Sequence, residues 1–487
     1  MEWFDAEGWT VARTVAQRGV AAVYVVAFVA VLRQFRPLLG EHGLLPVPAF
    51  VARVPWRSAP SLFHRRYSDR LLVVVGWTGL VLALSVVVGL PQQGPPWVPL
   101  LVFLALFGLY LSVVNVGQVF YGFGWESLLL EAGFLCAFLG SDRVAPPVTV
   151  LALLWWLVLR LELGAGLIKW RGDRAWRDLT ALYYHHETQP MPNPLSRWFH
   201  LLPRPLHRVE VAANHVTQLL VPFLLLAPGP VASAGAAIMV VTQAWLVLSG
   251  NFAWLNGLTM VLAFSAVDDA SLAWLLGLLG ADVDPASWSA GTEPAPAWFV
   301  VVVLAVSAWL VVLSRHPLRN LVSRRQLMNA SFNAWHLVNA YGAFGSITRR
   351  RVEVVVEGTL DEDPDDAAWR EYEFRGKPGD VRRVPPQYAP YHLRLDWGMW
   401  FLGLGSSAQM RWFVPFLARL LEADAPTLRL LRRDPFDGRP ARWVRARLYH
   451  YRFATREERR STGQWWVRSD EGLLVDVHDL RSLRRYL

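Results

Sequence analysis

Cysteine is almost absent from this 487-residue sequence, whose one cysteine, Cys136, lies inside an apolar run. A single cysteine excludes a disulfide within the chain, a CxxC redox pair and a zinc site built from cysteines. Common enzyme signatures are missing too: we find no GxSxG, no Walker phosphate loop and no dinucleotide fingerprint. The N-terminus, MEWFDAEGW, is acidic and lacks a clean small-residue cleavage site after the first apolar run, so we expect no cleavable signal peptide.

Lysine is nearly as rare, since the chain has 46 arginines but only two lysines, Lys169 and Lys377. So strong a bias is typical of a GC-rich, bacterial coding sequence. A lysine in such a chain is hard to attribute to coding bias, and arginine cannot replace it as a base because arginine stays protonated. Lys377 lies in RGKPGD, where a surface turn is the better interpretation. Lys169 lies in an apolar stretch and has no such explanation.

Charge is unevenly distributed along the chain. Residues 1–314 contain 18 Lys and Arg and 18 Asp and Glu, whereas residues 315–487 contain 30 and 21, so the whole excess of +9 lies in the C-terminal third. Acidic residues are interleaved with the basic ones there, and no nucleic-acid recognition motif is visible. The balance therefore predicts attraction to anionic membrane lipids and no binding of nucleic acid.

Long apolar runs fill the first two thirds of the chain, which is 54% hydrophobic overall. A helix needs about 20 apolar residues to cross the hydrocarbon core of a membrane. The runs predict an α-helical polytopic membrane protein with about nine spans, the eighth broken near Asp268. The predicted spans are residues 19–34, 71–90, 97–120, 125–140, 147–168, 209–227, 231–249, 252–280 and 297–314.

The loops between these spans alternate in charge. With nine spans, the basic loops at 33–70, 169–208 and 315–325 fall on one side of the membrane, and neutral or acidic loops such as 267–296 fall on the other. Because basic loops favour the cytoplasm, the alternation predicts an N-terminus outside the cell and a C-terminal domain in the cytoplasm.

The residue pattern changes after about residue 345. Alternating or β-branched stretches there predict strands, and amphipathic stretches predict helices. The strands are expected at 352–358, 371–375 and 444–454, and the helices at 411–422 and 427–436. We therefore divide the chain into a polytopic helical membrane domain at residues 1–320, a connecting segment at 321–345 and a soluble C-terminal α+β domain at 346–487.

Six stretches contain recognisable motifs: WESLLLEAGFL (125–135), GLIKWRGDRAWRDLTALYYHHETQPMPNPLSRW (167–198), LSGNFAWLNGLTMVLAF (248–264), VNAYGAFGSITRRRVEVVVEGTLDE (338–362), YEFRGKPGDVRRVPPQYAPYHLRLDWGMWF (372–401) and GQWWVR (463–468). In this order they resemble the lipase maturation factor family. The resemblance implies a multi-pass membrane protein that, in animals, resides in the endoplasmic reticulum and helps secreted lipases fold and assemble. It also implies a luminal C-terminal domain, whereas the loop charges predict a cytoplasmic one.

A fainter resemblance covers the first half of the chain. AGLIKW (165–170), followed by AWRDLTALYY (175–184), is similar to the segment of vitamin K-dependent carboxylase-type membrane domains that contains a catalytic lysine base. On that match, Lys169 takes the position of the base.

The candidate catalytic residues are Lys169, Glu162 and His185. Glu162 and Lys169 are seven residues apart, so they share one face of a helix. Each charged side chain at bilayer depth costs about 2.5–3.5 kcal/mol, so these groups must pair, reach the interface or line a cavity. One interpretation is a structural ion-pair network with snorkelling side chains. The other is that Lys169 is a base polarised by Glu162 or His185.

The loop after Lys169 contains further candidates. GDRAWRDLTALYY (172–184) has apolar residues at helical spacing, which predicts an amphipathic helix that lies at the membrane interface or packs under the bundle, with Trp176 available to a client. YYHHETQP (183–190) contains His186 and Glu187, which we interpret either as a polar cover or proton relay over Lys169, or as a solvated helix end. Adjacent residues on a helix point about 100° apart, so we expect the two neighbouring histidines to bind no metal.

HLRLDWGMWF (392–401) is the last candidate binding segment. It combines His392, Arg394 and Asp396 with aromatic residues that include Trp397 and Trp400. It is expected to dock the soluble domain onto the membrane domain, with the aromatic side chains as anchors. An ordinary buried segment with an internal Arg394–Asp396 pair explains the pattern equally well.

Two functions fit these observations. The first is a membrane-bound, chaperone-like maturation factor with membrane lipids and a lipase-like client polypeptide as partners, acting without an evident cofactor and not as an enzyme. The second is an intramembrane enzyme of carboxylase-like type that uses Lys169 as general base on a hydrophobic substrate and binds a quinone-like or lipid molecule. Both require a multi-pass protein, in the plasma membrane of a prokaryote or, by the family resemblance, in the endoplasmic reticulum membrane.

Overall fold

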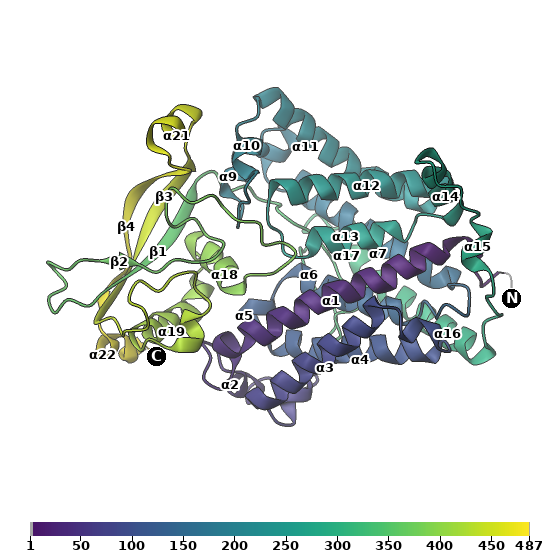
Figure 1. Cartoon of the computed structure of the whole chain (residues 1–487), viewed down its shortest axis with the longest axis horizontal. Coiled ribbons are helices and arrows are strands. Elements are labelled where there is room, and N and C mark those ends of the chain that lie inside the picture. Colours follow the sequence, from purple (N-terminus) through teal and green to yellow (C-terminus); the bar gives the residue numbers. More distant parts are fainter. Residues whose placement is uncertain (1–2, 487) are drawn as a thin grey trace.

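The computed structural model describes residues 3–486 and has two parts that lie end to end (Figure 1). One part is a bundle of long helices, and the other contains a β-sheet with helices packed beside it. The main helices of the bundle are α1 (Thr10–Leu39), α3 (Asp69–Val87), α4 (Trp97–Val116), α6 (Gly124–Ala137), α7 (Val148–Arg171), α11 (Arg204–Leu219), α12 (Gly229–Ser249), α13 (Leu255–Phe264), α14 (Asp269–Leu278), α16 (Ala297–Leu313) and α17 (Arg315–Val322). Shorter helices join them, namely α2 (Val47–Val51), α5 (Gln118–Tyr121), α8 (Arg174–Arg177), α9 (Leu182–Thr188), α10 (Ser196–His200) and α15 (Ala286–Ser289).

The predicted number of nine spans is not confirmed. Within the described residues, seven helices are long and apolar enough to cross a membrane, or eight if the bent pair α13 and α14 is one span. The fourth predicted span is α6, which has 14 residues and is buried along nearly its whole length. Its apolar sequence reflects a place at the centre of the bundle, which composition cannot distinguish from contact with lipid. The eighth predicted span is broken near Asp268, as expected, and its two helices meet at 103°.

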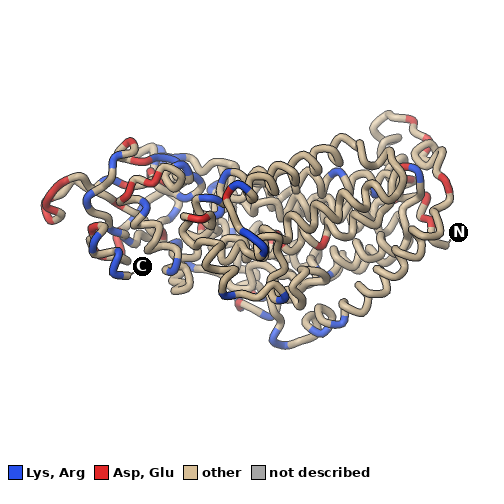
Figure 2. The backbone as a smooth tube through the Cα atoms, turned by 90° about the horizontal axis from the view of Figure 1, so that it is seen from below, with Lys and Arg blue, Asp and Glu red and all other residues tan. Residues whose placement is uncertain are grey.

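The two ends of the bundle differ in the way that the loop charges predict. After α6 the chain lies beside the start of α1, where the Gln17 side chain donates to the Gly140 carbonyl over 2.9 Å. At the far end of α1, Arg419 of the C-terminal domain donates to the His42 carbonyl over 2.7 Å. Lys and Arg gather toward that end, whereas acidic residues prevail near the N-terminus (Figure 2). Which end faces the cytoplasm stays a prediction.

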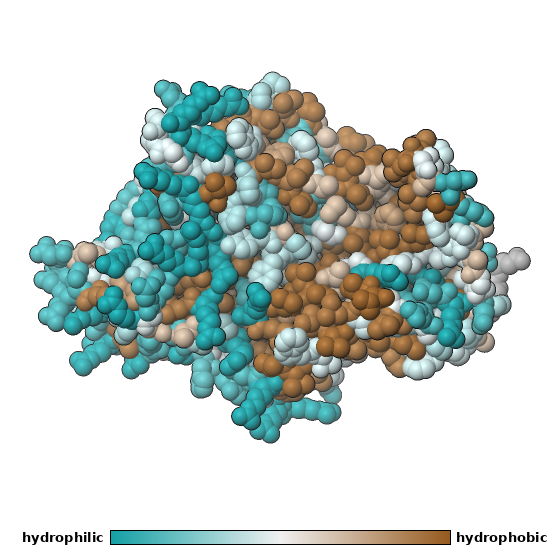
Figure 3. Space-filling view, viewed as in Figure 1, coloured by the Kyte–Doolittle hydropathy of each residue, from teal (hydrophilic) through white to brown (hydrophobic). Residues whose placement is uncertain are grey.

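Apolar side chains cover the outside of the bundle. Figure 3 shows a broad hydrophobic surface over the helices and a mainly hydrophilic surface over the C-terminal domain. The exposed apolar residues include Val81 on α3, Val241 on α12 and Val301 on α16, each at least 60% exposed. A helical bundle that is hydrophobic on its outer face is suited to a lipid environment. The protein is therefore a multi-pass membrane protein.

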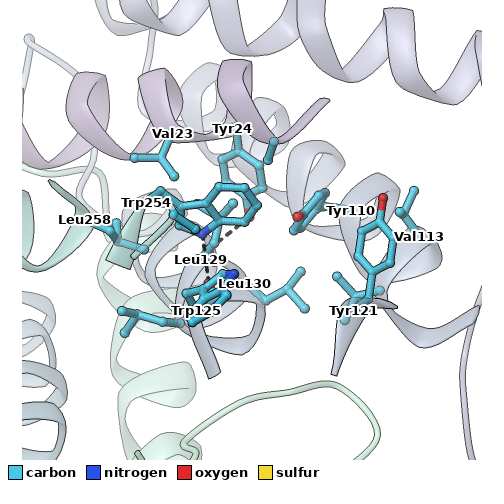
Figure 4. Packing of buried hydrophobic residues seen from close by; sticks show 14 of the residues in the cluster. Val23, Tyr24, Tyr110, Val113, Tyr121, Trp125, Leu129, Leu130, Trp254 and Leu258 are labelled. Carbon is cyan, nitrogen blue, oxygen red and sulfur yellow. Dashed lines mark hydrogen bonds between the residues drawn. The ribbon is translucent and has the colours of Figure 1, made fainter. Parts of the chain in front are cut away.

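Aromatic side chains fill the centre of the bundle (Figure 4). Trp254 is fully buried, and its indole nitrogen donates to the Trp125 carbonyl over 3.1 Å. The Tyr24 hydroxyl donates to the Leu129 carbonyl over 3.2 Å. These bonds satisfy polar atoms in a setting where water cannot, and they fix α6 between α1 and α13.

The C-terminal domain contains an antiparallel sheet with strand order β2-β1-β3-β4 in the described part of the chain. Its strands are β1 (Arg351–Thr359), β2 (Arg370–Glu371), β3 (Trp443–Phe453) and β4 (Trp466–His478), and its helices are α18 (Arg394–Gly403), α19 (Met410–Leu421), α20 (Ala425–Leu428), α21 (Arg456–Thr462) and α22 (Leu480–Leu483). In the central pair, Val355 of β1 faces Arg447 of β3. The expected strands at 352–358 and 444–454 and the helix at 411–422 are confirmed. The strand expected at 371–375 is shorter than predicted, because β2 ends at Glu371 and Glu373 forms only an isolated bridge with Arg433.

Two helix predictions are wrong in part. Residues 427–436 form only the end of α20 and then turns, because Asp434 caps a turn by accepting from the Phe436 and Gly438 amides. Residues 172–184 form two short helices, α8 and α9, because Leu179 between them has a φ of 58°. Backbone with positive φ cannot continue a right-handed helix.

Candidate functional site

A cavity of about 760 Å³ lies where the bundle meets the C-terminal domain. It is lined by α7, α11, α12 and α13, by residues 341–348, and by one face of α18. Most of its wall is apolar, but polar side chains form one part of it. They include Glu162, Lys169, Glu210, Asn214, Gln218, Gln243, Asn256 and Thr259.

The cavity opens sideways between α11 and α12. Val209 on α11 and Val241 on α12 both line it, and they are 64% and 70% exposed. Leu206 and Trp245 likewise line the cavity and are also exposed on the outer surface. Since these residues belong to the apolar outer surface of the bundle, the opening faces the lipid, and an apolar molecule could enter without crossing water.

Lys169 and Glu162 meet in this cavity through a chain of amides. The Lys169 ammonium donates to the side-chain oxygens of Asn214 and Gln218 over 3.0 and 2.8 Å. The Gln218 amide in turn donates to one Glu162 oxygen over 3.1 Å, and the Gln243 amide donates to the other over 2.6 Å. A buried cation and a buried anion are thus joined by a fully bonded network, which is the condition for keeping charges inside a membrane domain.

Trp176 and His185 form the aromatic wall next to Lys169. The Lys169 nitrogen lies 5.0 Å from the centre of the Trp176 ring, within the range of a cation–π contact. Trp176 is only 3% exposed, and its indole donates to the Phe344 carbonyl. Trp176 therefore packs under the bundle, which was one of its two expected places, and does not lie at the membrane interface, because the chain turns at Leu179 and folds this side chain inward.

His185 lies among aromatic rings on the wall of the same cavity. It stacks on Phe252, with ring centres 6.3 Å apart, and meets Phe344 edge to face at 4.8 Å. Burial lowers the pKa of His185 to about 3, so its imidazole is neutral at physiological pH. The structure therefore brings the three proposed catalytic residues to one cavity; whether they catalyse a reaction stays a prediction.

His186 and Glu187 do not line the cavity that contains Lys169. His186 is 2% exposed and lies beside His207 and Glu210 of α11. Glu187 accepts from the Phe453 backbone amide over 2.7 Å, which joins α9 to β3. The interpretation of both residues as a solvated helix end or a cover over Lys169 is wrong, because the loop folds against α11 on one side and the C-terminal domain on the other.

The segment at 392–401 lies at the contact between the two domains. Arg394 is fully buried and donates to Glu126 of α6 over 2.7 Å. The amide of Gln34 on α1 donates to the His392 carbonyl over 2.7 Å and accepts from the Arg394 backbone amide over 2.9 Å. The described residues contain no Arg394–Asp396 pair, so that alternative is wrong. Asp396 instead accepts from the Gly376 amide over 2.6 Å.

Aromatic rings complete this contact. His392 packs edge to face against Trp125 at 5.1 Å and Trp397 at 5.9 Å. Trp400 donates to the Thr188 carbonyl over 3.1 Å and lines the cavity with Trp397. Burial lowers the pKa of His392 to about 4, so the ring is neutral. Whether any residue of this segment also binds a client stays a prediction.

The sequence context of Lys377 predicted a surface turn. This prediction is wrong, because the side chain is buried. It is 4% exposed and forms an ion pair with Glu353 on β1, which also pairs with Arg351. Arg351 donates to the Glu187 carbonyl over 2.9 Å, so this buried group of charges lies against the loop of the membrane domain. Burial lowers the pKa of Lys377 to about 8.

The sequence contained an unused signal for the polar wall of the cavity. Glu210, Asn214 and Gln218 are spaced four residues apart on α11, so they form a polar stripe on one face of this helix. Gln243 and Asn256 gave a weaker signal, because each is the only amide side chain in its helix and neither helix contains a charged residue.

The fold and the cavity define a multi-pass helical membrane protein with a C-terminal α+β domain. Residues 11–274 match the lipase maturation factor transmembrane domain, and residues 337–475 match the lipase maturation factor C-terminal domain. The chain is 40% identical to human lipase maturation factor 1, over 97% of this chain and 89% of that protein. It is 30% identical to human lipase maturation factor 2, over 93% of this chain and 80% of that protein.

The chain therefore belongs to the lipase maturation factor family, which confirms the main resemblance. No solved structure matches it significantly. These matches lend no support to the fainter resemblance to carboxylase-type membrane domains.

Proposed function

We propose that this chain is a membrane-bound maturation factor that assists the folding or assembly of a lipase-like client in a chaperone-like manner. The observation that supports the proposal most strongly is the match to human lipase maturation factor 1, which extends over both domains and 97% of the chain. A match to the membrane domain alone would support a shared fold but not a shared type of client.

In this proposal the cavity at the domain junction accepts an apolar group. Its volume of about 760 Å³ is in the range of ligand sites in proteins. Its opening toward lipid suits an acyl chain or an apolar segment of a client that is still folding, and α18 of the C-terminal domain forms part of its wall.

The test is co-expression of a secreted lipase with this chain in cells that lack their own maturation factor. Secreted lipase activity per amount of lipase protein should rise with the chain present. Val209→Trp, which places a bulky ring at the cavity opening, should reduce that rise several-fold. Val216→Trp is the matched control, because Val216 is an exposed valine of the same helix that does not line the cavity.

The two outcomes test different statements. No rise in specific lipase activity with the native chain would contradict the maturation role itself. A rise that Val209→Trp leaves intact would contradict only the role of the cavity.

A second candidate is an intramembrane enzyme with Lys169 as general base. It is favoured by one observation, the burial of Lys169 and Glu162 on the wall of a cavity that opens to lipid. In that case a quinone-like or lipid molecule should co-purify with the detergent-extracted protein and be detectable by mass spectrometry. Lys169→Arg should then abolish activity without changing the amount of folded protein, whereas under the chaperone-like proposal it should be nearly silent.

The orientation can be tested with single cysteines, because Cys136 is the only native one. With Cys136 replaced, cysteines at the exposed positions 57, 174 and 460 are labelled from one side of the membrane. The loop charges support a cytoplasmic location for all three, in a bacterial plasma membrane. Labelling of position 460 only from outside would support the luminal orientation implied by the family and contradict the charge-based one.

A further inference from the structure

Three side chains from two separate helices converge beside the cavity. His186 lies on α9, and His207 and Glu210 lie in the first turns of α11. One ligand atom from each lies within 4.8 Å of those from the other two. No other group of three or more His, Cys, Asp or Glu side chains in residues 3–486 meets this condition.

The polar atoms of this group lack partners. Neither ring nitrogen of His186 has a hydrogen-bond partner among the described residues, although the side chain is only 2% exposed. The Nδ1 atom of His207 and one carboxylate oxygen of Glu210 are likewise buried and unbonded. His186 Nε2 lies 3.8 Å from Glu210 Oε2, which is too long for a hydrogen bond. Buried polar atoms left unbonded are costly, and one such atom from each of the three residues lies within 4.8 Å of the other two, which favours a bound group between them.

The remaining contacts hold these side chains in place. The second oxygen of Glu210 accepts from the Trp245 indole of α12 over 2.8 Å. The Nε2 atom of His207 lies 3.3 Å from the His200 carbonyl, which leaves Nδ1 as its free nitrogen. Ligands that are oriented by a second hydrogen bond are typical of metal sites in proteins.

We propose that His186, His207 and Glu210 bind a Zn²⁺ ion. Two imidazole nitrogens and one carboxylate oxygen form a donor set that Zn²⁺ uses in proteins with bonds of about 2.0–2.2 Å, and such three-ligand sites keep a fourth position for water or another ligand. Tetrahedral ligands at that bond length are about 3.3 Å apart, so small side-chain rotations would close the observed separations around an ion.

The proposed zinc site lies at the edge of the cavity. Glu210 lines the cavity, and Leu206 and Val209 on the same turns of α11 border its opening. An ion bound to His186 on α9 and to α11 fixes the loop after α8 against the helix that forms this border. No metal was predicted from the sequence because the adjacent pair His185 and His186 cannot share an ion. The second histidine of the proposed site is His207, 21 residues beyond His186.

The test is the zinc content of the full-length protein, extracted in detergent through a histidine-free tag and measured by mass spectrometry of the elements. We expect about one zinc per chain, or the same stoichiometry on titration with Zn²⁺ after chelation. His207→Asn and Glu210→Gln should each lower the occupancy at least tenfold. His215→Asn is the matched control, a buried histidine of the same helix outside the cluster.

A positioning variant separates a metal site from a merely structural cluster. Trp245→Phe removes the hydrogen bond to Glu210 but keeps an aromatic ring, so zinc affinity should fall about 10- to 100-fold while the folded protein elutes as the native one does. Cobalt in place of zinc should give the visible absorption of a four-coordinate ion.

The proposal is overturned if the native protein binds no stoichiometric zinc in either experiment. It is also overturned if the folded His207→Asn variant keeps its zinc, or if His215→Asn loses it to the same extent. The test does not depend on lipase maturation, so its failure would leave the proposed function untouched.

Discussion

The helical bundle and the C-terminal domain place their charges in opposite ways. In the bundle, Arg160 of α7 pairs with Glu131 of α6, and these side chains are 2% and 4% exposed. In the C-terminal domain, the Arg442–Glu362 pair is 54% and 85% exposed. A lipid-facing surface cannot hydrate a charge, so the bundle turns its few charges inward and must bond each of them. The C-terminal domain can leave most of its charges in water.

The junction between the two parts shares the character of the bundle. Arg394, Asp396 and Lys377 belong to the C-terminal domain by sequence but are all buried. The contrast therefore predicts that charge substitutions are severe in the bundle and at the junction and mild at the periphery of the C-terminal domain.

The largest effect should come from Arg394→Leu. The substitution leaves Glu126 charged and buried without its main partner, which costs about 3–5 kcal/mol. Thermal unfolding of the detergent-solubilised protein should show a large fall in the unfolding midpoint. The double variant Arg394→Leu with Glu126→Leu should recover most of the loss, because neither charge is then left alone. A single variant as stable as the native protein would show that the junction does not depend on this ion pair.

A pH-dependent effect of similar size is expected at Asp396. Burial raises the pKa of Asp396 from 3.8 to about 6, so between these pH values the folded chain binds more protons than the unfolded chain. Its contribution to the free energy of unfolding therefore falls as the pH rises from about 4 to about 6, by about 3 kcal/mol in total. Asp396→Asn keeps an oxygen for the Gly376 amide and cannot ionise. It should be more stable than the native protein at pH 7 and lose that advantage near pH 4, as measured by unfolding midpoints. Parallel profiles for the two proteins would contradict this.

A smaller effect is expected from Gln218→Leu inside the bundle. The change removes one bond from Lys169 and one from Glu162, each worth about 1–3 kcal/mol when a buried group is left unbonded. The unfolding midpoint should fall, and it should fall more than in Val216→Leu, a lipid-facing change one half-turn earlier on the same helix. Equal midpoints for the two variants would mean that water already bridges these groups.

The smallest effect is expected from Arg442→Ala at the periphery. Exposed ion pairs contribute about 0–1 kcal/mol, so the unfolding midpoint should shift little, and added salt should erase the difference. A loss comparable to that of Arg394→Leu would remove the distinction between the two regions.

The local sequence pattern was sufficient to predict a strand or a span where the residue types of the segment, or the length of its apolar run, determine the structure. The strand at 352–358 is β-branched and buried on both faces, the strand at 444–454 alternates between more and less buried residues, and the long spans have the length and composition that lipid requires. The same reasoning failed for α6, whose apolar sequence serves burial among helices. It also failed at Leu179, because a leucine gives no sequence signal for a positive φ.

The candidate site was predictable only in part, because it is assembled from distant segments. Lys169 stood out through the rarity of lysine, and Glu162 through its helical spacing. The partners of Lys169 come from α11, and the partner of Arg394 lies 268 residues away. Lys377 was misread because a Pro-Gly turn is usually exposed, whereas here the turn is covered by the other domain. Such contacts are set by tertiary packing and have no local signature.

The side chain of Gln34 has a consequence for the order of synthesis. It bonds the backbone on both sides of Leu393 from a helix made some 360 residues earlier. At elongation rates of about 5–20 residues per second, that interval lasts about 20–70 s. During that time Gln34 is already in the membrane without the backbone groups that it binds in the finished protein. Glu126, once it is made, has Tyr110 as a partner but lacks Arg394. The first helix therefore lacks these binding partners until the last domain is made. An arrest of translation before residue 394 would leave Glu126 buried without Arg394, and quality control can recognise such a chain as incomplete.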